Sequence, residues 1–163
     1  MESILLAVAV IAGSSPLRAE LEPLRFLVGH CWTAEFPNRP GERDTQCFEP
    51  VFEGQHVRSR HKVSGASKPY EGETLFSYDG KQVTFTYWNS LGGVSTGGMR
   101  AEAGTLKFGD ESYTGPDGRK LNFSTTWRRI DANTYEAVTA APGSPELSRT
   151  MRYKRNPSDP PIR

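Results

Sequence analysis

The sequence predicts an all-β protein: a single antiparallel up-and-down β-barrel of about eight to ten strands, with a short N-terminal helix that closes one end. Three observations support this fold class. Apolar and polar residues alternate in short runs, which is the period-2 pattern of strands with one buried face. The 16 glycines and 12 prolines lie between these runs as turn residues. The runs recur about every ten residues with no helical period between them, and this spacing indicates a sandwich or a barrel.

The length and charge of the chain limit the classes of protein to which it can belong. Its 163 residues are enough for one domain with its own core, and no second domain is expected. The 20 basic and 19 acidic side chains give a net charge of +1, and the two signs are interspersed. Because a phosphate-binding face needs clustered basic residues, no nucleic-acid partner is predicted.

The N-terminal segment differs in composition from the rest of the chain. An uncharged apolar run at residues 4–12 is followed by a polar break and a small residue at Ala19. This pattern predicts a signal peptide over residues 1–19, although Glu2 precedes the run and no basic residue does. The alternative is a disordered or membrane-tethered N-terminus. Because the apolar run is too short to span a bilayer, we expect no stable membrane insertion after processing and an exported bacterial protein, periplasmic or secreted.

The barrel domain, residues 20–154, is predicted to begin with one or two helical turns and a strand. The turns fall at residues 20–27, where Pro23 is early enough to be tolerated in a first turn, and they are expected to close one barrel end. Residues 31–36 then alternate, with Trp32 facing inward. After a turn at residues 37–41, residues 44–49 return as a second strand with Gln46 and Phe48 on one face.

The two cysteines are expected to form a disulfide. If the first hairpin is centred on Arg39, Cys31 lies directly opposite Cys47 on the outer face, with a Cα separation of about 4.5 to 5.5 Å. A disulfide can bridge that distance. The alternative is a pair of reduced cysteines. No metal site is predicted, since the chain has three histidines and no Cys-x-x-Cys spacing.

The third strand is expected at residues 56–63. Its alternation places Ser59 and His61 inside the barrel and the basic residues Arg58, Arg60 and Lys62 outside. A row of charges on a strand is usually a solvated face.

The next hairpin is predicted around Asp79-Gly80, the strongest short hairpin signal in the chain. It joins strands at residues 70–78 and 82–88. A two-residue turn at this position places Phe76 opposite Val83 on an apolar face.

The rest of the barrel is expected from further alternating runs. Residues 89–99 are rich in glycine but lack the Lys-Ser/Thr of a phosphate loop, so a flexible loop is predicted. Strands are expected at residues 99–108, 112–114, 120–130, 134–141 and 147–154. Gly109-Asp110 is interpreted as a turn, and residues 155–163, with three prolines, as a flexible C-terminal tail.

The sequence resembles lipocalin-like bacterial domains of unknown function in the calycin superfamily, which are distantly related to nitrobindin-type and fatty-acid-binding-protein-like β-barrels. The resemblance covers about residues 21–154 and rests on Leu24-x-Phe26-Leu27-Val28-Gly29-x-x-Trp32, the segment Gly72–Gly80, Trp88-x-Ser90-x-Gly92 and Arg149-x-Met151-x-Tyr153. It implies a barrel but no activity, because fold does not fix function. The nitrobindin branch binds haem through a histidine near its C-terminus. This chain has no histidine after His61, so that role is not carried over.

The first functional hypothesis is a non-enzymatic protein that binds a small hydrophobic or amphipathic molecule in the lumen. The predicted lumen residues combine aromatic side chains with a few polar groups. The eleven candidates are Trp32, Gln46, Phe48, Ser59, His61, Phe76, Phe85, Tyr87, Phe123, Thr125 and Trp127. The alternative is that the aromatic residues fill a solid core, since each buries roughly 150 to 250 Å² and folding alone explains them.

Two further hypotheses remain open at the level of sequence. The first is a haem protein or an enzyme that uses His61 as axial ligand or general base. No acidic residue that would orient this histidine is evident, so no catalytic residue is assigned. The second is a structural or interaction module of the cell envelope, in which the outward basic residues meet an acidic partner.

Overall fold

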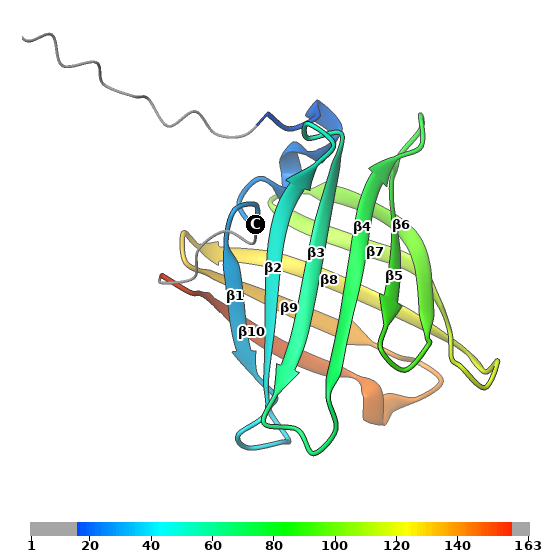
Figure 1. The fold of residues 1–163 in the computed structure, drawn as a ribbon. Coiled ribbons are helices and arrows are strands. Elements are labelled where there is room, and N and C mark those ends of the chain that lie inside the picture. Colours follow the sequence, from blue (N-terminus) through cyan, green and yellow to red (C-terminus); the bar gives the residue numbers. More distant parts are fainter. Residues whose placement is uncertain (1–15, 158–163) are drawn as a thin grey trace, which may run out of the picture.

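The computed structural model describes residues 16–157 and shows a closed barrel of ten antiparallel strands (Figure 1). The fold class predicted from the sequence is confirmed. Each strand pairs with its neighbours in the chain, and the last strand pairs with the first. The strands are β1 (Cys31–Glu35), β2 (Arg43–Val51), β3 (His56–Ser64), β4 (Tyr70–Tyr78), β5 (Val83–Asn89), β6 (Val94–Glu102), β7 (Thr105–Thr114), β8 (Lys120–Asp131), β9 (Thr134–Ala140) and β10 (Arg149–Arg155).

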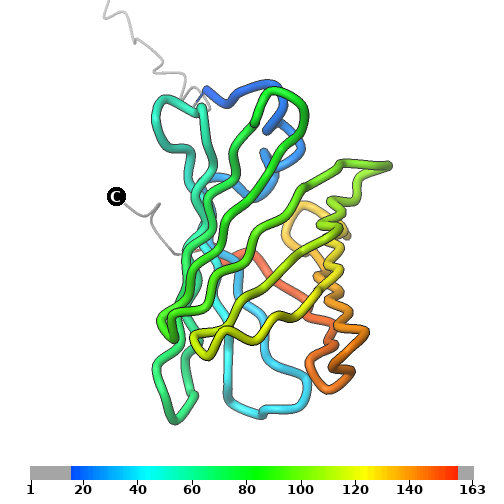
Figure 2. The backbone as a smooth tube through the Cα atoms, turned by 90° about the vertical axis from the view of Figure 1, so that its right-hand side faces the viewer, coloured from blue at the N-terminus to red at the C-terminus, as the bar shows by residue number. Residues whose placement is uncertain are grey.

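The barrel closes through a short seam between β1 and β10. Two residue pairs, Trp32 with Arg155 and Thr33 with Lys154, join these strands. The backbone N–H of Asn156 adds a hydrogen bond of 2.8 Å to the carbonyl oxygen of Cys31. Figure 2 shows the red end of the chain returning to the blue beginning. Arg155, the first residue of the predicted tail, is therefore the last residue of β10, and residues 158–163 lie outside the described residues.

The predicted N-terminal helix is a 3-10 helix, η1 (Ala19–Leu24), that lies across the upper end of the barrel in Figure 1. Its hydrogen bonds span three residues, as from the Arg25 N–H to the Glu22 carbonyl, and Pro23 has no N–H for an α-helical bond. Leu21 and Leu24 on this helix are fully buried against the barrel core. A second 3-10 turn, η2 (Pro145–Leu147), lies in the β9–β10 connection.

The residues before η1 also contact the barrel. The Arg18 N–H donates to the Gly54 carbonyl at 3.0 Å, and the Arg18 guanidinium lies 4.7 Å from the centre of the Tyr78 ring. The predicted signal peptide includes these residues, and its first fifteen residues lie outside the described part of the chain. In the described residues, no helix has the length and apolar character that a membrane crossing requires.

The predicted disulfide is confirmed. Cys31 faces Cys47 across β1 and β2, their Cα atoms are 4.0 Å apart, and the two sulfur atoms are bonded. The bridge closes a loop with a sequence separation of 16 residues, which corresponds to roughly 3 kcal/mol of stabilisation in the chain-entropy model. It fixes the register of the first hairpin on the outside of the barrel.

The register predicted for the β4–β5 hairpin is wrong by two residues. Phe76 pairs with Phe85, and Val83 pairs with Tyr78. The loop is longer than a two-residue turn because the Asp79 carboxylate accepts hydrogen bonds from the N–H groups of Lys81 and Gln82. A shift of two residues leaves every side chain on its predicted face.

The glycine-rich segment at residues 89–99 is only partly a loop. The chain turns at residues 90–93, and β6 begins at Val94 and includes Gly97 and Gly98. The strand expected at residues 99–108 is instead the end of β6, a turn at Ala103-Gly104 and the start of β7. Gly109-Asp110 is a β-bulge within β7, where the pairing with β8 shifts between Phe108 and Glu111.

Candidate functional site

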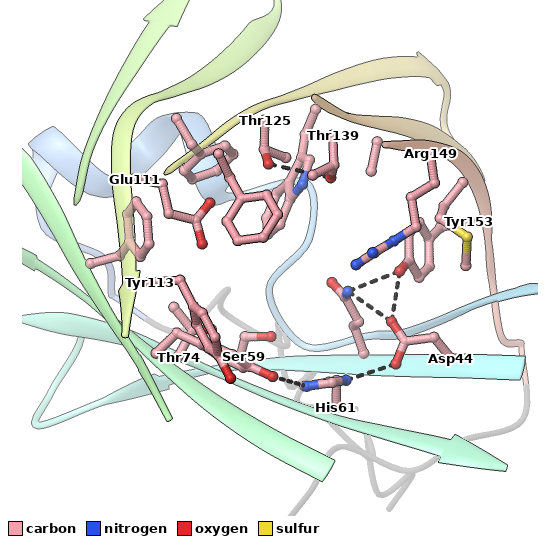
Figure 3. Close-up of a pocket in the computed structure, with 18 of the residues that line it drawn as sticks. Asp44, Ser59, His61, Thr74, Glu111, Tyr113, Thr125, Thr139, Arg149 and Tyr153 are labelled. Atoms are coloured by element: carbon pink, nitrogen blue, oxygen red, sulfur yellow. Dashed lines mark hydrogen bonds and ion pairs between the residues drawn. The ribbon is translucent and has the colours of Figure 1, made fainter. Parts of the chain in front are cut away.

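A cavity of about 330 Å³ occupies the lumen (Figure 3). Its lining residues place its opening at the end of the barrel opposite η1. Phe36 and Leu147, from the connections at that end, lie at its mouth. Its wall combines aromatic and aliphatic side chains with hydroxyl, carboxyl, imidazole and guanidinium groups. The polar residues that line it include Asp44, Gln46, Ser59, His61, Tyr70, Thr74, Tyr87, Glu111, Tyr113, Thr125, Thr139, Arg149 and Tyr153.

Nine of the eleven predicted lumen residues line this cavity. They are Gln46, Ser59, His61, Phe76, Phe85, Tyr87, Phe123, Thr125 and Trp127. Trp32 and Phe48 also face inward, but they belong to the packed core near η1 and do not line the cavity. The Trp32 indole donates a hydrogen bond of 3.2 Å to the Leu27 carbonyl, which fixes the ring in that core.

His61 has an acidic partner that the sequence analysis missed. Asp44, on the neighbouring strand β2, lies 2.8 Å from the Nδ1 atom of His61 through its Oδ1 atom. The carboxyl group is almost completely buried, with 7% of its side chain exposed. The signal was present in the alternation of β2, because Asp44 shares the inward face with Gln46 and Phe48.

Asp44 is held by two more donors. The Tyr153 hydroxyl donates to its Oδ2 atom at 2.6 Å, and the Gln46 amide donates to the same oxygen at 2.9 Å. The Tyr135 hydroxyl in turn donates to the Gln46 Oε1 atom at 3.1 Å. Burial alone raises the pKa of Asp44, but the hydrogen bond and charge of His61, with the bonds from Tyr153 and Gln46, bring it below 3.8. Asp44 is therefore an ionised group in the lumen at neutral pH.

Two hydrogen bonds connect the other ring nitrogen of His61 to a tyrosine at the mouth of the cavity. Its Nε2 atom lies 2.9 Å from the hydroxyl of Tyr87 on β5, and this hydroxyl lies 2.8 Å from that of Tyr70, the first residue of β4. Gly72 makes the contact possible. A Cβ atom at Gly72 would lie 2.6 Å from His61 Nε2 and 2.5 Å from the Tyr87 ring.

The opposite wall carries a second carboxyl group in a different environment. Glu111 on β7 accepts one hydrogen bond, 2.6 Å from the hydroxyl of the fully buried Ser95. Burial raises the pKa of Glu111, and the Ser95 bond and the charge of Arg149 offset this only in part. Among the described residues Arg149 has no ion-pair partner, and its guanidinium points into the cavity (Figure 3).

The apolar part of the wall is a cluster of aromatic rings. Phe108 and Trp127 have ring centroids 4.6 Å apart, and Phe76 and Phe85 pack against Phe108 at 6.1 and 5.7 Å. Such ring pairs contribute about 0.5 to 1.5 kcal/mol each beyond the burial of their area. The cavity thus has a rigid aromatic side and a polar side.

The surroundings of His61 do not suit a haem ligand. Both ring nitrogens of His61 are already in hydrogen bonds, to Asp44 and to Tyr87, so neither is free to ligate iron. His56 lies outside the lumen and bonds to Ser77. No group of three or more His, Cys, Asp or Glu side chains that could hold a metal ion occurs within residues 16–157.

The basic residues of β3 face outward as predicted, and two of them are paired within the chain. Arg58 and Arg60 lie 2.6 and 3.2 Å from the Glu49 carboxylate. Lys62 stands opposite Glu71 on β4. The row is therefore largely neutralised by the protein's own acidic residues.

The fold and the cavity define the molecule as a closed ten-stranded β-barrel with a pocket in its lumen. A comparison of the chain with protein-family models found no match, and a search of the curated proteins found none either.

Proposed function

We propose that this barrel is a lipocalin-like binding protein that takes one small, partly apolar molecule into its lumen. The observation that carries the proposal is the cavity of about 330 Å³, with rings on one side and hydrogen-bonding groups on the other. Ligand pockets have this composition, and their volumes range from about 300 to 1,000 Å³. The volume is near the lower limit of that range, which favours a single compact ligand.

The cavity weighs against the solid-core alternative. Packed protein interiors contain few voids larger than a water molecule. The polar groups around this one, such as His61 and Arg149, could have been replaced by apolar side chains if the lumen served only for stability. Because Arg58 and Arg60 pair with Glu49, the structure offers less support for an envelope module that works through its basic face.

The same contacts favour binding over catalysis by His61. A general base needs a nitrogen directed at the substrate, and the Nε2 atom of His61 is directed at Tyr87. The Cys31–Cys47 disulfide is compatible with an oxidising location, and we propose that the protein is exported to the periplasm or secreted.

Native mass spectrometry of the mature protein from its own host tests the proposal. We expect a retained adduct of a few hundred daltons. The adduct is expected to be lost in Thr139→Trp, which places an indole in the cavity. Val138→Trp is the matched control, because Val138 is the neighbouring residue on β9 and faces solvent. An adduct that Thr139→Trp retains would contradict lumenal binding, and so would a bare polypeptide mass for a wild-type protein that also binds no added small molecule.

A further inference from the structure

A chain of three hydrogen bonds connects an ionised carboxylate inside the barrel to a phenol at its mouth. It runs from Asp44 through His61 and Tyr87 to Tyr70, with distances of 2.8, 2.9 and 2.8 Å. Each of the four groups comes from a different strand, β2 to β5. The direction of every bond in this chain follows from the number of protons on His61.

The neutral state of His61 makes Tyr70 an acceptor. The ionised Asp44 carboxylate can only accept, so the Nδ1 atom of His61 carries the proton and the Nε2 atom accepts. The Tyr87 hydroxyl must then donate to Nε2. Since its single proton is used, the Tyr70 hydroxyl donates to the oxygen of Tyr87, and Tyr70 offers the cavity only its lone pairs.

A proton on His61 reverses the outer bonds. Both ring nitrogens then donate, so the Tyr87 oxygen accepts from Nε2. The Tyr87 proton is free to bond to the Tyr70 oxygen, and the Tyr70 proton is free to bond to a ligand. The net charge of the Asp44–His61 pair also changes from −1 to neutral, which removes repulsion from an anion in the lumen.

We propose that the protonation state of His61 decides which ligand chemistry the lumen accepts. With His61 neutral, Tyr70 accepts a hydrogen bond and the pocket favours a small apolar molecule that bears a donor, such as an alcohol. With His61 charged, Tyr70 donates and the pocket favours the corresponding carboxylate. The inference rests on the proposed function, because it concerns the ligand of the same cavity.

Of the other ionisable groups that face the cavity, one could also cause a pH-dependent affinity. Burial raises the pKa of Asp44, but the hydrogen bond and charge of His61 and the hydrogen bonds from Tyr153 and Gln46 outweigh it and lower the pKa, so Asp44 is ionised at neutral pH. Burial raises the pKa of Tyr70, Tyr87, Tyr135 and Tyr153, and Arg149 stays charged. Tyr113, at the mouth, is hydrogen-bonded to Asn89. Glu111, whose pKa burial raises, is the competitor that the experiment must separate from His61.

The test compares two probes of the same shape, the naphthoate ion and the naphthalenemethanol with the same substitution position. Histidine is the side chain that changes charge between about pH 8 and pH 5.5, whereas an aromatic carboxylate is ionised throughout that range. By calorimetric titration, we expect naphthoate to bind about tenfold more tightly at the lower pH, the factor that a charge-assisted hydrogen bond supplies. The affinity for naphthalenemethanol is expected to change less than about twofold, because a hydroxyl group can accept as well as donate.

Three variants assign the effect. Tyr70→Phe removes only the last hydroxyl of the chain. It is expected to reduce the pH dependence of naphthoate affinity to the smaller part that comes from the charge of the Asp44–His61 pair. Glu111→Gln is expected to retain it. Tyr78→Phe, on the same strand but outside the cavity, is the matched control and is expected to behave as the wild type.

An NMR titration of the imidazole rings gives a readout that does not depend on the variants. If protonation of His61 strengthens naphthoate binding, then bound naphthoate must favour the protonated form of His61 by the same factor. We therefore expect the His61 signals to change at higher pH when naphthoate is bound. The chain has three histidines, so few signals need to be assigned.

The outcomes separate this inference from the proposed function. If neither probe binds at any pH and the protein from its host carries no adduct, the proposed function fails. If the probes bind but naphthoate shows no pH dependence, or Tyr70→Phe retains the full wild-type dependence, the inference about His61 is overturned and lumenal binding stands. Loss of the pH dependence in Glu111→Gln overturns it as well, since Glu111 is then the group that titrates.

Discussion

The lumen holds two carboxyl groups whose surroundings push their pKa values in opposite directions. Asp44 accepts bonds from His61, Tyr153 and Gln46, and these donors outweigh the effect of burial. Glu111 has the Ser95 hydroxyl as its hydrogen-bond donor, and for this residue burial outweighs the other effects. Asp44 is thus a stable negative charge, whereas ionised Glu111 is a cost to the folded state.

Glu111→Gln is expected to stabilise the protein in a pH-dependent way. Because the pKa of Glu111 is raised above 4.5 on folding, the stability that its proton supplies is complete below pH 4.5. That stability is lost as the pH rises through the folded-state value. In urea unfolding, the variant should match the wild type at pH 4 and exceed it at pH 8, by an amount on the order of 1 kcal/mol. Glu53→Gln on an exposed loop is the control, and an equal gain at both pH values would contradict the explanation.

Two strands carry a glycine on the inner face of the barrel, and each glycine lies under an aromatic ring. Gly72 on β4 leaves room for the Tyr87 ring and for His61, and Gly97 on β6 leaves room for the Phe85 ring. A Cβ atom at Gly97 would lie 2.8 Å from that ring. These glycines let rings from β5 lie against the backbone of both neighbouring strands, which fixes their orientation toward the cavity.

Gly72→Ala is therefore expected to disturb the polar side of the cavity. The new methyl group would also lie 2.7 Å from the Trp88 carbonyl oxygen. Because this oxygen belongs to the backbone, rotation of the Tyr87 and His61 rings does not relieve all of the clash. We expect a loss of about 1 to 3 kcal/mol in the free energy of unfolding. We also expect the pH dependence of the variant's naphthoate affinity to be reduced as in Tyr70→Phe, because the displaced His61–Tyr87 bond no longer connects His61 to Tyr70.

Gly109→Ala is the matched control for that substitution, since a Cβ atom at Gly109 meets no other atom within 4 Å. If Gly72→Ala is as stable as Gly109→Ala and binds naphthoate with the full pH dependence of the wild type, the role assigned to Gly72 is wrong.

The sequence predicts strands and faces where the alternation is unbroken. The pairing of Cys31 with Cys47 and the inward side chains of β2 to β5 follow directly from that alternation. The same alternation extends to Asp44, which the sequence analysis did not assign to the inner face, and its pairing with His61 becomes evident only when the β2–β3 register is known.

The residues of β7 could not be predicted in the same way. The bulge at Gly109-Asp110 changes which alternate residues face inward, from Phe108 before it to Glu111 and Tyr113 after it. Asp110 adopts a φ of 54°, a backbone conformation that also occurs in turns. The Gly109-Asp110 pair in the sequence therefore fits a turn as well as a bulge. The bulge adds one residue to the strand, so the residues after it face the opposite side from the one that the alternation before it predicts. For this reason the sequence did not identify Glu111 as a lumen residue.

At the scale of the molecule, the two ends of the barrel have different compositions. The end under η1 is filled by Leu21, Leu24, Leu27, Trp32 and Tyr135, all fully buried. The other end contains the cavity and its polar groups. The closed end supplies apolar burial for stability, and the open end leaves space for a ligand.

Substitutions at the closed end are therefore expected to affect stability without affecting binding. Leu24→Ala creates a cavity in the packed core and should lower the free energy of unfolding by about 2 to 5 kcal/mol, measured by urea titration. The affinity for naphthoate should stay within about twofold of the wild type, since Leu24 does not line the pocket. Leu91→Ala is the control, because 57% of Leu91 is exposed and its loss should change stability by less than about 0.5 kcal/mol. A large loss of affinity in Leu24→Ala would show that the two ends are coupled.

The seam between β1 and β10 determines when the chain can finish folding. The strands that Trp32 and Arg155 join are the first and the last to leave the ribosome. Until β10 arrives, β1 and β9 each expose a strand edge, and exposed edges pair readily with other polypeptides. Closure is therefore a late event in biosynthesis, and a nascent chain interrupted before Arg155 is a substrate for chaperones or proteases instead of a smaller barrel.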